Sequence, residues 1–132
     1  MSAPVELLRR VPLFQGLERD HLEMVARSFK DRTFRAGQTV TSEGSGGVGF
    51  FVIEDGTATV SVHGDERRKL GTGDYFGELA LIDDSPRSAT IVADSDLRCW
   101  GLTSWEFRPL VESNASIAWS MLQMMAKRLR EA

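Results

Sequence analysis

Short runs of β-forming residues, most of them ending in a turn signal, fill the middle of the chain. They span residues 33–35, 38–42, 48–54, 57–63, 67–70, 88–92 and 97–102. Strands at such regular short spacing, with glycine in the turns, predict a closed sandwich or barrel. Parallel α/β architecture is excluded because no helices intervene to carry the crossovers. A mainly β fold, with a small jelly roll as its body, fits the pattern best.

One turn signal is specific enough to predict a pairing. Asp55-Gly56 stands between the runs 48–54 and 57–63, and both residues tolerate positive φ angles. The pair therefore predicts a β-hairpin between these two runs.

Both ends of the chain have helical spacing. A brief helical pattern covers residues 5–10, and apolar residues recur at helical intervals over residues 18–29. Near the C-terminus, Thr103 or Ser104 can cap a short helix, and Asn114 can cap a longer one over residues 115–130. The sequence thus predicts helices flanking the jelly roll on both sides.

The last predicted helix has an unusually broad apolar face. One stripe is formed by Ile117, Met121, Met124, Met125 and Leu129, and four further apolar residues widen it: Ala118, Trp119, Leu122 and Ala126. A single contact with the barrel needs less apolar surface. The helix either packs entirely on its own domain or offers a second surface to a partner, and the sequence leaves both open.

The chemistry concentrates in residues 71–92, GTGDYFGELALIDDSPRSATIV. A short helix is predicted from Gly77, and it stops by Pro86, which has no amide hydrogen and restricts the residue before it. The first turn of a helix that opens on glycine leaves amide N–H groups free for an anion. Arg87 follows the stop and can present a planar, two-pronged donor to phosphate. We therefore expect a phosphate pocket without a metal.

Glu78 complements this pocket. Its carboxylate would repel a phosphate, so an acceptor role toward a neighbouring sugar hydroxyl suits it better. One phosphate and one free ribose hydroxyl are the groups that a cyclic nucleotide presents. The alternative is that Arg87 is a surface cation and Glu78 a favourable charge near the start of a helix.

The stretch FGELAL at residues 76–81, followed by PRSAT at residues 86–90, resembles the phosphate-binding cassette of the cyclic nucleotide-binding domain family, of catabolite activator and kinase regulatory subunit type. The resemblance implies that Glu78 binds the ribose 2′-hydroxyl, that Arg87 pairs with the cyclic phosphate, and that nearby backbone amides complete the cradle. The implied ligand-binding residues are Phe76, Gly77, Glu78, Leu79, Ala80, Pro86, Arg87, Ser88 and Ala89.

The resemblance also implies an architecture. Residues 1–132 would form one domain: an N-terminal helical unit over 1–30, an eight-stranded jelly-roll β-barrel over 31–102 with the cassette at 71–92, and C-terminal helices over 103–132. Ligand binding would move the terminal helices. A helix-turn-helix domain of the catabolite activator type lies outside this sequence, and the residue that caps the base would lie near or beyond Ala132.

Ser88 bears on the choice of base. In the family, alanine at this place accompanies a preference for cAMP and threonine a preference for cGMP. The serine resembles the arrangement in bacterial cAMP activators, so the expected ligand is cAMP rather than cGMP.

Composition and charge argue against several other classes of protein. The 132 residues suffice for one domain, and a net charge of −3 argues against a surface built to coat nucleic acid. Cys99 is the only cysteine, so we expect a buried, inert thiol and no intrachain disulfide. No apolar run approaches the length of a membrane span, and the N-terminus lacks a secretory h-region. These features predict a reduced, cytoplasmic setting.

The sequence gives little support for a catalytic or metal-binding function. The glycine-rich residues 44–49 lack the Lys-Ser/Thr of a P-loop, and His21 and His63 do not form a metal-ligand pair with neighbouring acids. Asp74, Asp83 and Asp84 fit turn chemistry. We expect no enzyme activity and no cofactor, and a metalloenzyme of the cupin kind is disfavoured. The alternative to a nucleotide sensor is a non-binding module of the same fold that acts in protein interaction or dimerisation.

Overall fold

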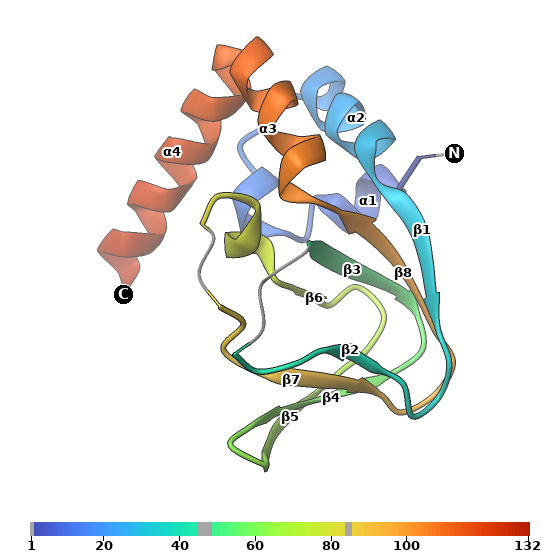
Figure 1. The fold of residues 1–132 in the computed structure, drawn as a ribbon. Coiled ribbons are helices and arrows are strands. Elements are labelled where there is room, and N and C mark those ends of the chain that lie inside the picture. The colour runs from blue at the N-terminus through green and yellow to red at the C-terminus, as the bar shows by residue number, and fades with distance from the viewer. Residues whose placement is uncertain (1, 45–48, 84–85) are drawn as a thin grey trace.

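The computed structural model describes residues 2–44, 49–83 and 86–132. Within these ranges eight strands form two four-stranded antiparallel sheets, which confirms the predicted mainly β jelly roll. Figure 1 shows the helices gathered above β1, β8 and β3, with β2, β7, β4 and β5 beneath them. The helices therefore cover one sheet, and the second sheet closes the other side of the barrel.

The first sheet has the order β1-β8-β3-β6 and the second the order β2-β7-β4-β5. The strands are β1 (Lys30–Phe34), β2 (Thr39–Thr41), β3 (Phe50–Asp55), β4 (Ala58–Val62), β5 (Asp65–Leu70), β6 (Tyr75–Phe76), β7 (Thr90–Ala93) and β8 (Leu97–Leu102). The helical elements are α1 (Val5–Leu8), η1 (Pro12–Phe14), α2 (Arg19–Ser28), η2 (Glu78–Leu81), α3 (Ser104–Ser113) and α4 (Ala115–Glu131). Both η1 and η2 are short 3₁₀ turns.

The central strands of the first sheet, β3 and β8, are buried on both faces over most of their length, which explains why apolar residues predominate in them. Along β3, Phe50 and Val52 point into the cluster beneath the helices, while Phe51 and Ile53 point into the space between the sheets. A strand alternates its side chains between two faces, so this one strand serves two cores.

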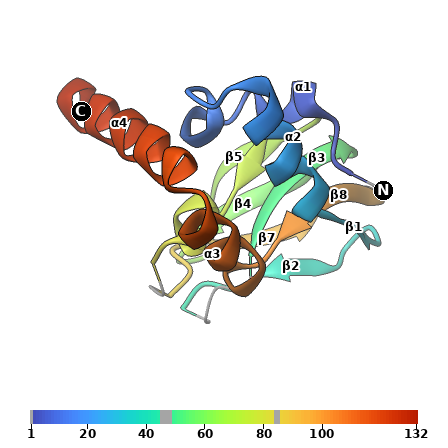
Figure 2. The ribbon, with the colours of Figure 1, turned by 90° about the horizontal axis from the view of Figure 1, so that it is seen from above.

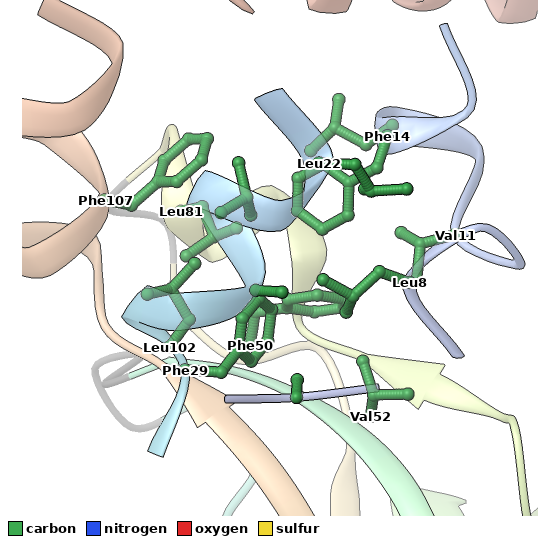
Figure 3. Close-up of a cluster of buried hydrophobic side chains, with 14 of the residues drawn as sticks. Leu8, Val11, Phe14, Leu22, Phe29, Phe50, Val52, Leu81, Leu102 and Phe107 are labelled. Atoms are coloured by element: carbon green, nitrogen blue, oxygen red, sulfur yellow. The ribbon is translucent and has the colours of Figure 1, made fainter. Parts of the chain in front are cut away.

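The core beneath the helices is rich in aromatic rings. Phe14 meets Phe29, Phe50 and Phe107 edge-on or tilted, with ring centroids 5.9 to 6.5 Å apart. Leu81 of η2 belongs to the same cluster and lies near Leu102 and Phe107 in Figure 3. The cassette is therefore joined to the terminal helices through a continuous apolar core.

The predicted hairpin at Asp55-Gly56 is wrong. β3 and β4 lie in different sheets, so these residues carry the chain from one sheet to the other. Gly56 has a φ of +102°, and a Cβ there would lie 3.0 Å from Cα of Leu97, so the crossover still needs glycine. The true hairpin joins β4 to β5 at His63-Gly64, where both φ angles are positive.

Other boundaries differ by a few residues. β1 begins three residues before the predicted run, and the two-residue strand β6 was not predicted. Ser88 and Ala89 precede β7 instead of opening it. Val48, where the third predicted run begins, and Asp84 and Ser85 lie outside the described residues.

Both predicted C-terminal helices are present, but one of the two predicted caps differs. Thr103 precedes α3, and its N–H and hydroxyl both donate to the Glu106 carboxylate, at 3.1 and 2.6 Å. Asn114 precedes α4, but its side-chain amide donates to the carbonyl of Leu110 instead of capping the new helix. The junction is thus tied back to α3.

α4 packs on the domain along one face only. Ile117 and Met121 are buried and Met124 is half-buried, whereas Trp119 and Leu129 are 64% and 77% exposed. Leu129, which the sequence places on the same apolar stripe, is therefore not part of the packed face. In Figure 2 the helix extends away from the barrel as a rod with the C-terminus at its tip. Among the described helices, none is long and apolar enough to cross a membrane.

Candidate functional site

A cavity of about 660 Å³ opens between the second sheet and the cassette. Its apolar wall comes from Val60, Leu70 and Ile91, on β4, β5 and β7. Its polar wall comes from Glu78 at the start of η2, from Arg87 and Ser88 just before β7, and from arginines of β5 and α4. One small-molecule-sized hollow therefore combines an apolar surface with charged groups at one end.

Gly77 shapes the polar end. Its φ of +82° belongs to the left-handed region, which glycine adopts without strain. A Cβ at this position would overlap Nη1 of Arg87 and lie 2.7 Å from the carbonyl oxygen of Gly49. The absence of a side chain is what lets the Arg87 guanidinium lie against the backbone here.

Arg87 is held from several directions. Its Nη2 donates to the carbonyl of Gly49, and its own carbonyl accepts from the N–H of Gly44 at 2.7 Å. Its Nε is buried and has no hydrogen-bond partner among the described residues. Burial disfavours the charged form of the guanidinium and therefore lowers its pKa. An anion in the cavity would offset that cost.

Glu78 is the acidic counterpart. Its side chain is only 15% exposed, and Oε1 lies 3.9 Å from Nη1 of Arg128 on α4. Its Oε2 is buried and accepts no hydrogen bond within the described part of the chain. Burial raises the pKa of this carboxyl, and the positive charges of Arg128 and Arg68 partly oppose that rise.

The ionisable lining is predominantly positive. Among the described residues, four arginines line the cavity, namely Arg67, Arg68, Arg87 and Arg128, against the two acids Asp74 and Glu78. Asp74 accepts from the N–H of Gly71 at 2.8 Å, so it serves a turn as predicted. No cluster of metal-ligating side chains occurs within residues 2–44, 49–83 and 86–132. The cavity suits a small organic anion.

Most of the predicted site residues meet at this cavity. Its lining includes Phe76, Gly77, Glu78, Arg87, Ser88 and Ala89. Phe76 also stacks on Phe51, with centroids 5.3 Å apart, so it forms part of the wall. The backbone of Leu79 and Ala80 belongs to η2, and Pro86 is exposed and does not line the cavity.

Sequence reasoning missed three of the arginines. Arg67 and Arg68 reach the cavity because β5 pairs irregularly with β4 between Val60 and Ser61, which leaves Arg67 without an opposite residue. Arg128 follows Ile117, Met121 and Met124 at helical spacings of 4, 3 and 4. That spacing places Arg128 on the inward face of α4, and it is the signal that could have revealed it.

Comparison with known proteins agrees with this geometry. The family model "Cyclic nucleotide-binding domain" matches residues 31–114. A cyclic nucleotide-gated potassium channel from Rhizobium etli is 36% identical over 113 residues, which is 86% of this chain and 32% of the channel. A cAMP-dependent protein kinase regulatory subunit from Colletotrichum orbiculare is 35% identical over 109 residues, which is 80% of this chain and 28% of that subunit. The chain thus spans about a third of the length of these relatives.

A solved structure matches over nearly the whole chain. The N-terminal domain of a transcriptional regulator from Streptomyces coelicolor A3(2) superposes with a TM-score of 0.88 at 27% identity. The match covers 95% of this chain and 93% of that domain.

Proposed function

Since the chain belongs to the cyclic nucleotide-binding domain family, we propose that residues 1–132 act as a single regulatory domain that binds a 3′,5′-cyclic nucleotide in the 660 Å³ cavity. One observation carries the proposal. Arg87 and Glu78 line the same cavity, and each has a buried polar atom without a hydrogen-bond partner among the described residues. Buried polar groups are normally paired, so a ligand with one anion and one hydroxyl would complete both.

The phosphate would bind at the Arg87 end. The guanidinium of Arg87 lies against the backbone of Gly77 there, and its Nε–H has no partner among the described residues. The amides of Leu79, Ala80, Ser88 and Ala89 would complete the cradle, as the family resemblance implies. The ribose 2′-hydroxyl would donate to Glu78, since an ionised carboxylate accepts strong hydrogen bonds.

Among cyclic nucleotides we favour cAMP over cGMP. The basis is the serine at position 88, which lines the cavity. The kinase regulatory subunit similar to this chain is named as cAMP-dependent, which supports the same choice.

Ligand binding would reach the terminal helices through η2. Leu81 packs in the same core cluster as Phe107 of α3 and Ile117 of α4. If the phosphate draws η2 toward Arg87, Leu81 must repack, and close-packed cores respond by shifting whole elements. We therefore infer a sensor that reports the ligand by moving α3 and α4, and not an enzyme. Its lone, buried thiol is consistent with a cytoplasmic site of action.

The second candidate is a module that acts only in protein interaction or dimerisation. The outer face of α4 favours it, because Ala115, Trp119, Leu122, Ala126 and Leu129 follow at spacings of 4, 3, 4 and 3. That is the spacing of a coiled-coil seam. The partner would be a second copy of this chain or an effector helix, and a sensor could use the same seam.

A heat-stability scan separates the two candidates. A ligand that binds only the folded state adds about 2.7 kcal/mol at a concentration 100 times its Kd, so the midpoint must rise. We expect a rise with cAMP, a smaller one with cGMP and none with 5′-AMP, which lacks the cyclic ester. A flat response to both cyclic nucleotides would favour the interaction module.

A further inference from the structure

We propose that Arg128 of α4 is a positioning residue for Glu78: it holds one carboxylate oxygen and leaves the other to receive the ribose hydroxyl. This inference rests on the proposed function of the cavity. It assigns to the C-terminal helix a role in recognising the sugar.

The two oxygens of Glu78 lie in different environments. Oε1 faces Nη1 of Arg128 at 3.9 Å, and Oε2 is buried without a partner among the described residues. A carboxylate has acceptor sites on both oxygens, so one oxygen can stay paired with the cation while the other accepts from a hydroxyl. Because Glu78 lines the cavity, the arrangement leaves Oε2 as the acceptor for a hydroxyl of a ligand bound there.

α4 brings Arg128 to this place. Ile117 and Met121 of the same helical face are buried in the domain core, and the side chain of Arg128 is 45% exposed and lines the cavity. The guanidinium is therefore carried by a helix whose other end is anchored. Any movement of α4 relative to η2 changes the distance to Glu78.

Charge explains why Glu78 needs this partner. Burial disfavours the ionised form of Glu78, and the nearby positive charges are those of Arg128 and Arg68. The hydroxyl of Tyr75 is the other titratable group affected by Glu78, while Arg87 lines the same cavity. Because an ionised carboxylate is the stronger acceptor, the cation on α4 favours the form of Glu78 that binds the hydroxyl best.

The inference makes sugar recognition and helix docking reciprocal. If the docked α4 improves the acceptor for the 2′-hydroxyl, then a ligand with that hydroxyl must favour the docked α4 by the same factor. A ligand without the hydroxyl has no such means of stabilising α4.

Isothermal titration with cAMP and 2′-deoxy-cAMP tests this directly. The proteins are the wild type, Arg128→Ala, Arg128→Lys, and Arg130→Ala, which removes the same charge from the same helix at an exposed residue that does not line the cavity. We expect Arg128→Ala to weaken cAMP binding by about tenfold and 2′-deoxy-cAMP binding by much less, a coupling within the usual range for contacting groups. Arg128→Lys should recover part of the loss, and Arg130→Ala should change neither ligand.

A pH series gives a second readout. In Arg128→Ala the carboxyl of Glu78 loses a compensating charge, so cAMP affinity should begin to fall at a higher pH on acidification than in the wild type. A purely structural effect of the substitution would leave that midpoint unmoved. Thermal midpoints of the ligand-free variants verify folding, and Arg128→Lys carries the test if Arg128→Ala is unstable.

These results test the positioning role of Arg128 separately from the binding of a cyclic nucleotide. Equal losses for both ligands in Arg128→Ala, or no loss for either, would overturn the positioning role while leaving nucleotide binding intact. Failure of the wild type to bind any cyclic nucleotide would instead refute the proposed function on which the inference rests.

Discussion

Gly77 and Arg87 lie in direct contact at the polar end of the cavity, with the guanidinium occupying the space that a Cβ at residue 77 would need. The backbone of Gly77 is also left-handed, with a φ of +82°. Two separate physical demands, conformation and space, therefore fall on one residue of the cassette. The two requirements can be tested separately because Gly37 also has a left-handed backbone, but the space around it would accommodate a Cβ.

Gly77→Ala should weaken nucleotide binding as well as stability. An alanine in the left-handed region costs about 1–2 kcal/mol wherever it occurs. Gly37 has a similar φ of +87°, but a Cβ added there would meet no atom within 4 Å, so Gly37→Ala should lose only stability. Titration with cAMP and thermal unfolding of both variants check this; equal nucleotide affinities in the two would contradict the close approach.

Glu78→Gln should stabilise the ligand-free domain at neutral pH. The folded pKa of Glu78 is raised above its usual 4.5, so the folded state favours the protonated acid. Well below pH 4.5 the carboxyl is protonated whether folded or unfolded and costs nothing; as the pH rises through the folded pKa, the ionised group reduces stability. The variant avoids that loss while giving up part of the affinity for the ribose.

Thermal unfolding from pH 4 to 8 gives the measurement. The midpoint of Glu78→Gln should exceed that of the wild type at pH 7, with the difference shrinking on acidification. Glu112→Gln, at an exposed residue of α3, serves as the control. A lower midpoint for Glu78→Gln at pH 7 would show that its contact with Arg128 outweighs the cost of burial.

Cys99 should be inert in the folded domain. Its side chain is fully buried in the core between the sheets, and burial raises the pKa of the thiol to about 12. At pH 8 only about one thiol in ten thousand would be ionised, and the thiolate is the reactive form. A thiol-reactive dye should label the protein only in denaturant; rapid labelling of the native protein would contradict this burial.

The outer face of α4 should decide oligomeric state. Leu122 and Leu129 are 57% and 77% exposed and stand on the seam with Trp119. Leu122→Glu places a charge where a second helix would pack, so a dimer should dissociate without loss of thermal stability in the monomer. Gln123→Glu adds the same charge one residue away and should leave the mass unchanged. Sedimentation equilibrium measures the result, and a wild type that is monomeric at every concentration would exclude the seam as a homodimer contact.

Sequence reasoning succeeded where the signal is local. The last predicted strand, residues 97–102, agrees with β8 at both ends, and the helix over 18–29 differs from α2 by one residue at each end. The order of glycine, acid, stop and arginine also located Gly77, Glu78 and Arg87 at one cavity. Turn, capping and motif preferences act between residues close in sequence, so they can be read from the chain.

Prediction from the sequence failed for contacts between residues that lie far apart along the chain. Asp55-Gly56 marks a change of direction, but which strands then pair depends on the whole sheet, and β6 exists only because Phe51 and Val52 pair with it. Arg128 reaches Glu78 only through the packing of α4 on the domain. These contacts follow from tertiary packing, which local patterns do not determine.

The most direct test of the account is titration of the wild type and Arg87→Ala with cAMP, with Arg108→Ala as a matched control at an exposed site that does not line the cavity. Removing the cation that pairs with a buried phosphate should cost about 2–5 kcal/mol, or at least thirtyfold in Kd. Arg108→Ala should bind as the wild type does. Saturable binding that is unchanged in Arg87→Ala, or no binding by the wild type, would contradict the proposed cyclic nucleotide site.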